Sequence, residues 1–192
     1  MAGTLKVGGV TLATHSDSTG LVSLSNTVYP AGSTTPISIA IVSDKKPSGT
    51  SGGGYTADTW TSRTLDDEEF DPDNIVTLAN NQFTLISGKY YVKYFTTAFY
   101  CNSAFSRIYD RSNSTVIAYG TDAHTSKNRS SITDHTNSLS HGSCYLSMTT
   151  PTVYSIDFYP SAYDANNGGV EASETVSGVD VHFTQVDIMK IG

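Results

Sequence analysis

Apolar side chains at helical spacing are missing from this chain: no stretch of ten or more residues carries a convincing stripe of that kind. Without helices between its strands, a parallel sheet with crossover helices is excluded. Charged residues are also few, at 15%, whereas Gly, Ser, Thr, Asn and Tyr are abundant. Polar turn residues between short β-branched and aromatic runs predict an all-β protein.

Clusters of basic residues are missing too. The chain has 11 Lys and Arg against 18 Asp and Glu, a formal net charge of −7, and its basic residues are scattered, with no group larger than a local pair such as Lys127–Arg129. Nucleic-acid binding needs clustered cations, so we expect no nucleic-acid partner. No run approaches the roughly 18 apolar residues of a membrane helix, and residues 1–16 lack the apolar centre of a secretory signal. We therefore expect no membrane insertion, and assembly in a cytoplasm.

Only two cysteines occur, Cys101 and Cys144, and they do not form a CxxC pair, so a structural zinc site is not indicated. We expect free, buried thiols, because thiols stay reduced in a cytoplasm; a disulfide formed after release is the alternative. A domain of this size buries roughly 70% of its unfolded surface and needs no covalent staple.

Catalytic motifs are missing as well. The histidines follow no H-E-x-x-H or related spacing: His15, His124, His135, His141 and His182. The glycine-rich segment 49–54 lacks the Lys-Ser/Thr ending of a phosphate-binding loop. A surface-polysaccharide hydrolase, which needs two facing carboxylates, is kept as a remote alternative. We expect no enzymatic activity, no metal and no cofactor.

Two features leave a choice between a structural and a binding role. Residues 66–73, DDEEFDPD, place six carboxylates in eight positions; a solvated acidic loop is favoured, and a calcium site is the alternative. Trp60 is the only tryptophan. It is expected to fill the core or a subunit interface, and stacking on a ligand is the alternative.

The most informative segment is Gln82–Cys101, QFTLISGKYYVKYFTTAFYC. A short apolar run ends at the turn Ser87-Gly88, and the residues that follow are rich in Tyr, Phe, Val and Thr, which predicts a long strand. Even-numbered residues of 90–100 share one face, and odd-numbered residues of 91–101 share the other. Both faces are largely apolar, with Lys93 as the only charge, so we expect both to be covered, by a second sheet or by another subunit.

The rest of the chain divides into similar segments joined by polar turns. We expect strands at 37–42, 60–65, 74–78, 82–86, 89–101, 105–109, 115–119, 144–149, 153–159 and 179–191. Long polar loops are expected at 44–55, at 121–141 with a short strand near 131–133, and at 161–178. The pattern predicts an antiparallel two-sheet sandwich or jelly roll over residues 37–192.

Residues 1–36 differ in kind from the rest. Brief apolar segments at 5–7, 10–12 and 21–24 are separated by glycine and aspartate, and each is too short to build a core. An extended arm that becomes ordered against a partner, or between chains of an oligomer, is favoured over a frayed terminal strand.

Five segments occur in an order that resembles a known module: SDKKPSGTSGG, TWTSRTLD, LANNQFTLISGKYYV, FSRIYDRSNSTVIAYGT and VDVHFTQVDIMKI. They carry a GTxGG loop, a W-x-x-R-x-L strand, an N-Q-F-x-L-x-x-G-x-Y motif, an R-x-Y-D hairpin and a closing T-Q-V-x-I strand. Residues 37–192 thus resemble the C-terminal module of bacteriophage tail-fibre and other virion proteins. The resemblance implies a compact jelly roll of the tumour-necrosis-factor and complement-head type, which forms tight trimers.

In such a trimer, one sheet of each subunit faces the threefold axis. The resemblance therefore makes Tyr91, Phe95 and Phe99 candidate interface residues, since their apolar face is available for a neighbour. The 36 preceding residues are too few for a fibre shaft, so we expect this arm to attach the trimer to the particle.

The function implied is that of a virion structural protein, assembled in the host cytoplasm. It is a trimeric tail-fibre or head-fibre knob whose partners are other capsid or tail proteins; the alternative is a capsid decoration or cement protein. Adhesion to a host-surface glycan is a further role. Tyr163, Asn166 and Asn167 form the best small cluster for it, because aromatic faces stack on sugars and amides bind hydroxyls, although an ordinary turn explains them equally well.

Overall fold

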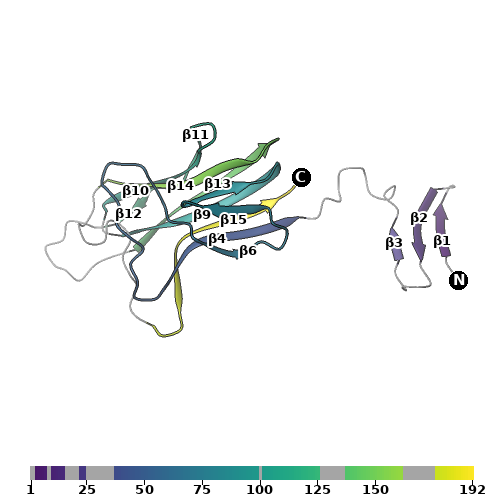
Figure 1. Ribbon diagram of the computed structural model, residues 1–192, viewed down its shortest axis with the longest axis horizontal. Helices are drawn as coiled ribbons and strands as arrows, with labels where there is room; N and C mark the ends of the chain where they lie inside the picture. The colour runs from purple at the N-terminus through teal and green to yellow at the C-terminus, as the bar shows by residue number, and fades with distance from the viewer. Residues whose placement is uncertain are drawn as a thin grey trace. The chain divides into compact units, whose positions relative to one another are not determined.

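The structure is a computed structural model, and the part of the chain that it describes contains strands and turns but no helix. The described residues are 3–7, 10–15, 22–24, 37–99, 101–125, 137–161 and 176–192. The chain divides into two compact units, Met1–Pro36 and Ile37–Gly192 (Figure 1). All described strand pairs in both units are antiparallel, so the all-β prediction is confirmed.

The first unit contains a small sheet. β1 (Gly3–Val7), β2 (Val10–His15) and β3 (Val22–Leu24) pair in that order, with a register shift between Leu5 and Lys6. The three apolar segments of the sequence therefore pair with one another, because their Thr, Val and Leu side chains favour strands. The role of this unit as an attachment arm stays a prediction.

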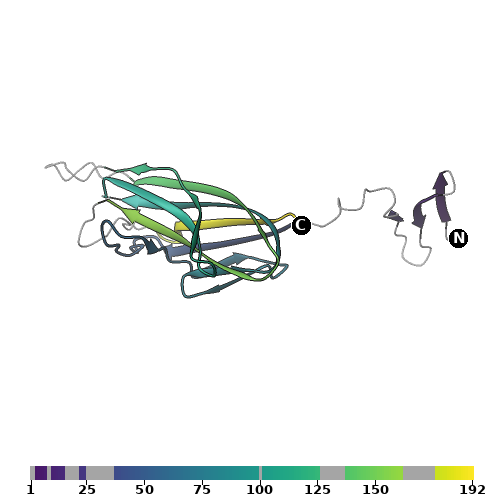
Figure 2. The same ribbon diagram turned by 90° about the horizontal axis from the view of Figure 1, so that it is seen from above.

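The second unit is a sandwich of two antiparallel sheets (Figures 1 and 2). One sheet has the order β13 (Asn137–Met148), β9 (Gly88–Phe99), β15 (Asp180–Lys190), β4 (Ser38–Pro47) and β6 (Asp67–Phe70). The other has the order β11 (Thr115–Tyr119), β10 (Ser103–Asp110), β14 (Thr152–Pro160), β8 (Gln82–Leu85) and β7 (Val76–Ala79), with β12 (Ala123–His124) beside β10 and β5 (Thr61–Ser62) beside β14. The predicted two-sheet sandwich is confirmed.

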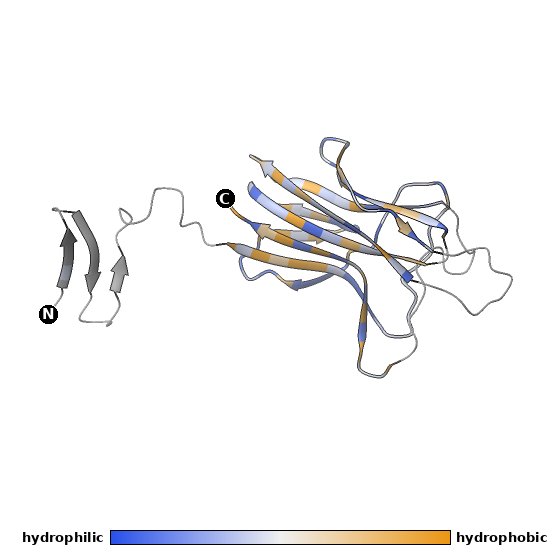
Figure 3. Cartoon of the chain, turned by 180° about the vertical axis from the view of Figure 1, so that it is seen from behind, coloured by the Kyte–Doolittle hydropathy of each residue, from blue (hydrophilic) through white to orange (hydrophobic). Residues whose placement is uncertain are grey.

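The segment that dominated the sequence forms β9, which lies between β13 and β15. Its even-numbered side chains face the core: Tyr90, Val92, Thr96 and Ala98 are fully buried, and Tyr94 is 3% exposed. Figure 3 shows hydrophobic and hydrophilic residues interspersed along the strands of the second unit. One face of β9 therefore covers the second sheet, and the other points outward.

Two strands extend into segments that the sequence predicted as loops. β13 begins at Asn137 rather than at residue 144, because it pairs with β9 from Asn137 opposite Phe99 to Met148 opposite Gly88. β4 continues to Pro47 because β15 pairs with it throughout. A polar segment can thus form a strand because the neighbouring strand supplies the hydrogen bonds. Its own sequence does not predict the strand, since it lacks alternating apolar residues.

The acidic segment forms an edge strand rather than a free loop. Residues 67–70 are β6, which pairs with β4. Lys45 Nζ lies 2.5 Å from Asp67 Oδ2, and Lys46 Nζ lies 3.4 Å from Asp66 Oδ2. Lysines on the neighbouring strand therefore hold the carboxylates along the sheet edge, and the charges also discourage pairing with another sheet there.

Arg63 is the largest fully buried side chain among the described residues. A register shift between β15 and β4 leaves Phe183 outside their ladder. Arg63 Nη2 donates to the carbonyl oxygen of Phe183 at 3.0 Å, and Nε donates to Thr184 Oγ1 at 2.8 Å. Its Cζ lies 4.8 Å from the Tyr55 ring centroid and 5.1 Å from that of Phe158. Arg63 thus supports the β-bulge at one end of the core.

Candidate assembly and binding surfaces

Four exposed side chains line up across the outer face of the five-stranded sheet. The register pairs Tyr145 of β13 with Tyr91 of β9. It also pairs Tyr91 with Met189 of β15, and Met189 with Ile39 of β4. Tyr145, Tyr91, Met189 and Ile39, named the apolar row, are 56%, 39%, 36% and 41% exposed. A contiguous row of this kind marks a surface suited to another protein.

A shallow hollow lies within the apolar row. Its volume is about 210 Å³, and its lining residues are Ile39, Tyr91, Lys93, Asp187, Ile188 and Met189. Lys93 and Asp187 face each other across β9 and β15. One charge of each sign therefore borders a mainly apolar depression, which can receive a partner's side chain while the charges restrict its orientation.

The predicted interface residues differ in the surface that they offer. Tyr91 belongs to the apolar row, and Phe95 on the same face is half-buried. Phe99 is only 5% exposed, so it has little surface left for a neighbour. Their role at an interface stays a prediction. The predicted glycan cluster lies outside the described residues: Tyr163, Asn166 and Asn167.

The other members of the apolar row were not found from the sequence. Ile39, Tyr145 and Met189 come from three strands that are far apart in the chain, and sheet order alone places them beside Tyr91. Each residue stands at an outward position of an alternating segment, and this alternation was the only sequence pattern that pointed to it. The pattern does not show which outward residues are neighbours until the strand order is known.

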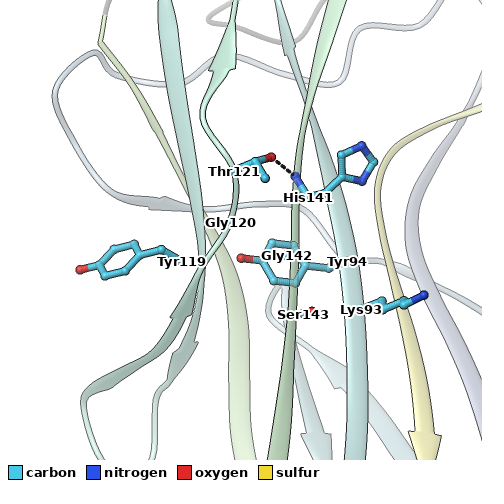
Figure 4. A pocket seen from close by; sticks show the side chains of 8 residues that line it. All are labelled: Lys93, Tyr94, Tyr119, Gly120, Thr121, His141, Gly142 and Ser143. Carbon is cyan, nitrogen blue, oxygen red and sulfur yellow. Dashed lines mark hydrogen bonds between the residues drawn. The ribbon is translucent and has the colours of Figure 1, made fainter.

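A second hollow, of about 560 Å³, lies at the edge of β13 (Figure 4). The Tyr94 ring occupies the space beside Gly142, where a Cβ would lie 2.3 Å from the ring carbon Cζ. At the rim, Thr121 N donates to the His141 carbonyl oxygen at 2.7 Å, and His141 N donates to Thr121 Oγ1 at 3.0 Å. Burial raises the pKa of Tyr94 to about 12. The phenol is therefore protonated at neutral pH and is not suited to act as a general base.

Within the described ranges, no group of three or more His, Cys, Asp or Glu is arranged to hold a metal ion. The carboxylates of β6 contact a histidine and a lysine instead: Glu69 Oε1 lies 2.9 Å from Nε2 of His182, and Oε2 lies 3.8 Å from Lys45 Nζ. His124 Nδ1 is 3.1 Å from Ser103 Oγ. In the same part of the chain, no helix is long and apolar enough to cross a membrane.

Both cysteines are free. Cys144 lies opposite Val92 on β9, whereas Cys101 lies beyond the end of that strand, so roughly 30 Å of extended chain separates the two positions along the sheet. Burial raises the pKa of Cys144 to about 11 and also raises the pKa of Cys101. Neither thiol is therefore suited to act as a nucleophile at neutral pH.

No protein-family model matches the chain, and no curated protein matches it either. Among solved structures, the globular domain of zebrafish complement 1qA protein is similar over 81% of this chain and 97% of its own, with a TM-score of 0.51 at 10% identity. Murine APRIL at pH 5.0 is similar over 80% of this chain and 98% of its own, with a TM-score of 0.48 at 9% identity.

At such low identity, the likeness to the complement domain concerns the fold alone. It agrees with the antiparallel strand pairing and the two layers described above. The second unit therefore has a jelly-roll fold of the tumour-necrosis-factor and complement-head type.

Proposed function

We propose that this chain is a non-enzymatic structural protein of a bacteriophage virion, and that its second unit forms a homotrimer. The trimer contact is the outer face of the five-stranded sheet. The first unit attaches the trimer to the particle, as part of a tail fibre or a head fibre assembled in the host cytoplasm.

The apolar row carries the proposal. It crosses four neighbouring strands and surrounds a hollow that suits a partner's side chain. A stable protein contact needs roughly 800 Å² on each partner, which is more than the row alone provides. Side chains on the same face, such as Phe95 and Ile41, would extend it. The threefold symmetry and the virion setting are supported by the motif order of residues 37–192.

The aspartate variant Tyr91→Asp is expected to abolish self-association. It places a charge in the middle of the apolar row, and burying an unpaired carboxylate at a subunit contact costs several times the thermal energy. Size-exclusion chromatography with light scattering measures the outcome. The unchanged protein should have three times the chain mass of 20.5 kDa, and the variant the mass of one chain.

The matched control is Ile86→Asp, because Ile86 is also 40% exposed but follows β8 in the other sheet. It should keep the trimer. Circular dichroism shows whether each variant is folded. A folded Tyr91→Asp protein that still has three times the chain mass contradicts the proposed contact surface, and a wild-type protein with the mass of one chain contradicts the trimer.

Gold labelling of intact phage particles tests the virion role. An antibody against residues 37–192 is expected to label purified particles of the phage that encodes the chain. Label at the tail tip identifies a tail fibre, and regularly spaced label over the head identifies a head fibre or decoration protein. Particles without label, beside a positive signal from infected-cell lysate, contradict a virion role.

A further inference from the structure

An aromatic and cationic cluster covers part of the outer face of the seven-stranded sheet. The ring centroid of Trp60 lies 5.2 Å from that of Tyr159 and 6.1 Å from that of Tyr119, with the rings tilted by 49° and 46°. Arg107 lies between two rings, with its Cζ 4.3 Å from the Trp60 centroid and 4.5 Å from the Tyr109 centroid. Trp60 is thus neither in the core nor on the apolar row.

A buried carboxylate holds the cluster in place. Asp157 is 1% exposed, and its Oδ2 accepts a hydrogen bond from Arg107 Nε at 3.0 Å and forms an ion pair with Arg107 Nη2, also at 3.0 Å. Its Oδ1 accepts from Arg111 Nη2 at 2.5 Å and from Ser155 Oγ at 2.8 Å. Arg111 also donates through Nε to Ser155 Oγ at 2.8 Å. The arginines, and the rings stacked on them, are therefore fixed before any ligand arrives.

We propose that this face binds an acidic glycan. Pyranose rings stack on Trp60 and Tyr119, and a ligand carboxylate meets the guanidinium of Arg111. The cluster is named the glycan face: Trp60, Tyr109, Tyr119, Tyr159, Arg107 and Arg111. It goes beyond the structural role proposed above, and it does not depend on trimer formation because one chain supplies every residue.

The aromatic part of the glycan face is accessible. Tyr119 is 64% exposed, and Trp60 and Tyr159 are half-buried. Their rings present flat apolar surfaces flanked by hydroxyl and guanidinium groups. A pyranose has apolar C–H groups on its faces and hydroxyls around its edge, so it can stack on such rings and hydrogen-bond to the groups beside them. The apolar row differs, because its aliphatic members Met189 and Ile39 offer no hydrogen bonds.

The charges of the glycan face favour an acidic ligand. Two arginines share one carboxylate, that of Asp157, so one positive charge is left over. The Arg111 side chain is 33% exposed, and its Nε and Nη2 already serve protein acceptors, which leaves Nη1 for a ligand. At the other end, the Tyr159 hydroxyl donates to Asp58 Oδ1 at 3.3 Å. The ligand carboxylate is therefore placed near Arg111.

The net charge of the whole chain distinguishes a local binding site from general attraction of anions. At −7, the protein repels polyanions in general. Saturable binding of an acidic glycan would therefore identify a local site and not diffuse charge attraction. Tyr159 lies opposite Phe105 on β10, six residues before Arg111, so the glycan face extends roughly 20 Å along the strand, a length that accommodates a short oligosaccharide.

Tryptophan fluorescence of the full chain tests the proposal directly, because Trp60 is the only tryptophan and lies in the glycan face. Oligogalacturonate is the probe with both pyranose rings and carboxylates. A dextran oligosaccharide of matched length has the rings alone, and polyglutamate has the carboxylates alone. Oligogalacturonate is expected to change the emission saturably, and the other two to bind at least about tenfold more weakly, because each lacks one of the two contacts.

Two variants and a matched control link the signal to the face. Tyr119→Ala removes an exposed ring and Arg111→Gln removes the exposed charge, and each should weaken oligogalacturonate binding about tenfold or more. Phe70→Ala removes a ring that is 50% exposed on β6 and should leave binding unchanged. Circular dichroism checks that each variant is folded.

Three results would overturn the proposal. They are no emission change with millimolar oligogalacturonate, an equal change with dextran, and an equal change with polyglutamate. Unchanged binding by folded Tyr119→Ala and Arg111→Gln proteins would do the same. Light scattering keeps this test separate from that of the trimer, because Tyr119→Ala should keep three times the chain mass while losing affinity, and Tyr91→Asp should do the reverse.

Discussion

Replacing Arg63 with methionine is expected to lower the free energy of unfolding by about 3 kcal/mol or more, which is among the largest effects of a single substitution. Methionine keeps much of the side-chain volume and removes the guanidinium. The carbonyl oxygen of Phe183 would then lose the guanidinium and keep the longer contact with the hydroxyl of Thr97, 3.3 Å away, and Thr184 Oγ1 would lose the Arg63 donor.

The cost arises because the β-bulge and the buried arginine depend on each other. Phe183 lies outside the β4–β15 ladder, so its carbonyl group needs another donor. Leaving such a group unpaired inside the protein costs roughly 1–3 kcal/mol, and the stacking of the guanidinium on Tyr55 and Phe158 adds to the loss. Asp44, fully buried nearby, would also lose the charge of Arg63, which offsets the rise in its pKa that burial causes.

Urea unfolding of the full chain, followed by circular dichroism, measures the loss. Arg63→Lys is the informative second variant: it keeps the charge but cannot reach Phe183 and Thr184 with two fixed donors, so it should be intermediate. Lys89→Met, at an exposed position of β9, should change the unfolding free energy by less than about 0.5 kcal/mol. An Arg63→Met protein as stable as the wild type would show that the bulge does not need the guanidinium.

The sequence predicted the strands that carry apolar alternation and missed those that do not. β9, β10, β14 and β15 were predicted close to their observed bounds because their side chains alternate between core and surface. The first half of β13, NSLSHGS, contains a single large apolar residue, Leu139. Its strand state is imposed by hydrogen bonds from β9, which a pattern search along one segment cannot detect.

The residues of the candidate surfaces were also predicted only in part. Tyr91 was predicted as an interface residue because its strand is apolar on both faces and the family resemblance implies a trimer that would cover the second face. Its partners in the apolar row depend on strand order, which no local pattern contains. The sequence left Trp60 with two roles, core or interface filling and ligand stacking, and the structure places it outside both the core and the apolar row.

The motif residues that carried the family resemblance turn out to include interior supports. In the W-x-x-R-x-L strand, Arg63 and Leu65 point into the core while Trp60 lies on the outer face. In the R-x-Y-D hairpin, Arg107 holds Asp157, and Asp110 accepts from the backbone N of Asn113 in the turn. These motifs therefore describe how the fold is held together, which explains why they predict the fold more closely than a function.

Asp157→Ala is expected to cost about 3–5 kcal/mol of unfolding free energy, the range found when one partner of a buried ion pair is removed. The carboxylate is 1% exposed and receives donors from Arg107 and Arg111, with Ser62 Oγ a further 3.2 Å contact. Without it, two neighbouring guanidinium groups repel each other over the middle of β14. Urea unfolding measures the loss.

The same substitution should disorganise the glycan face, because Asp157 fixes the guanidinium on which Trp60 stacks. The emission of Trp60 should therefore shift toward that of an exposed indole under conditions in which the protein is still folded. The control is Asp73→Ala, an exposed aspartate in the turn before β7 that belongs to neither proposed surface, and it should leave both stability and emission within experimental error. If Asp157→Ala is no more destabilising than Asp73→Ala, then the arginines do not need this carboxylate. In that case the rigidity on which the glycan face depends has another source.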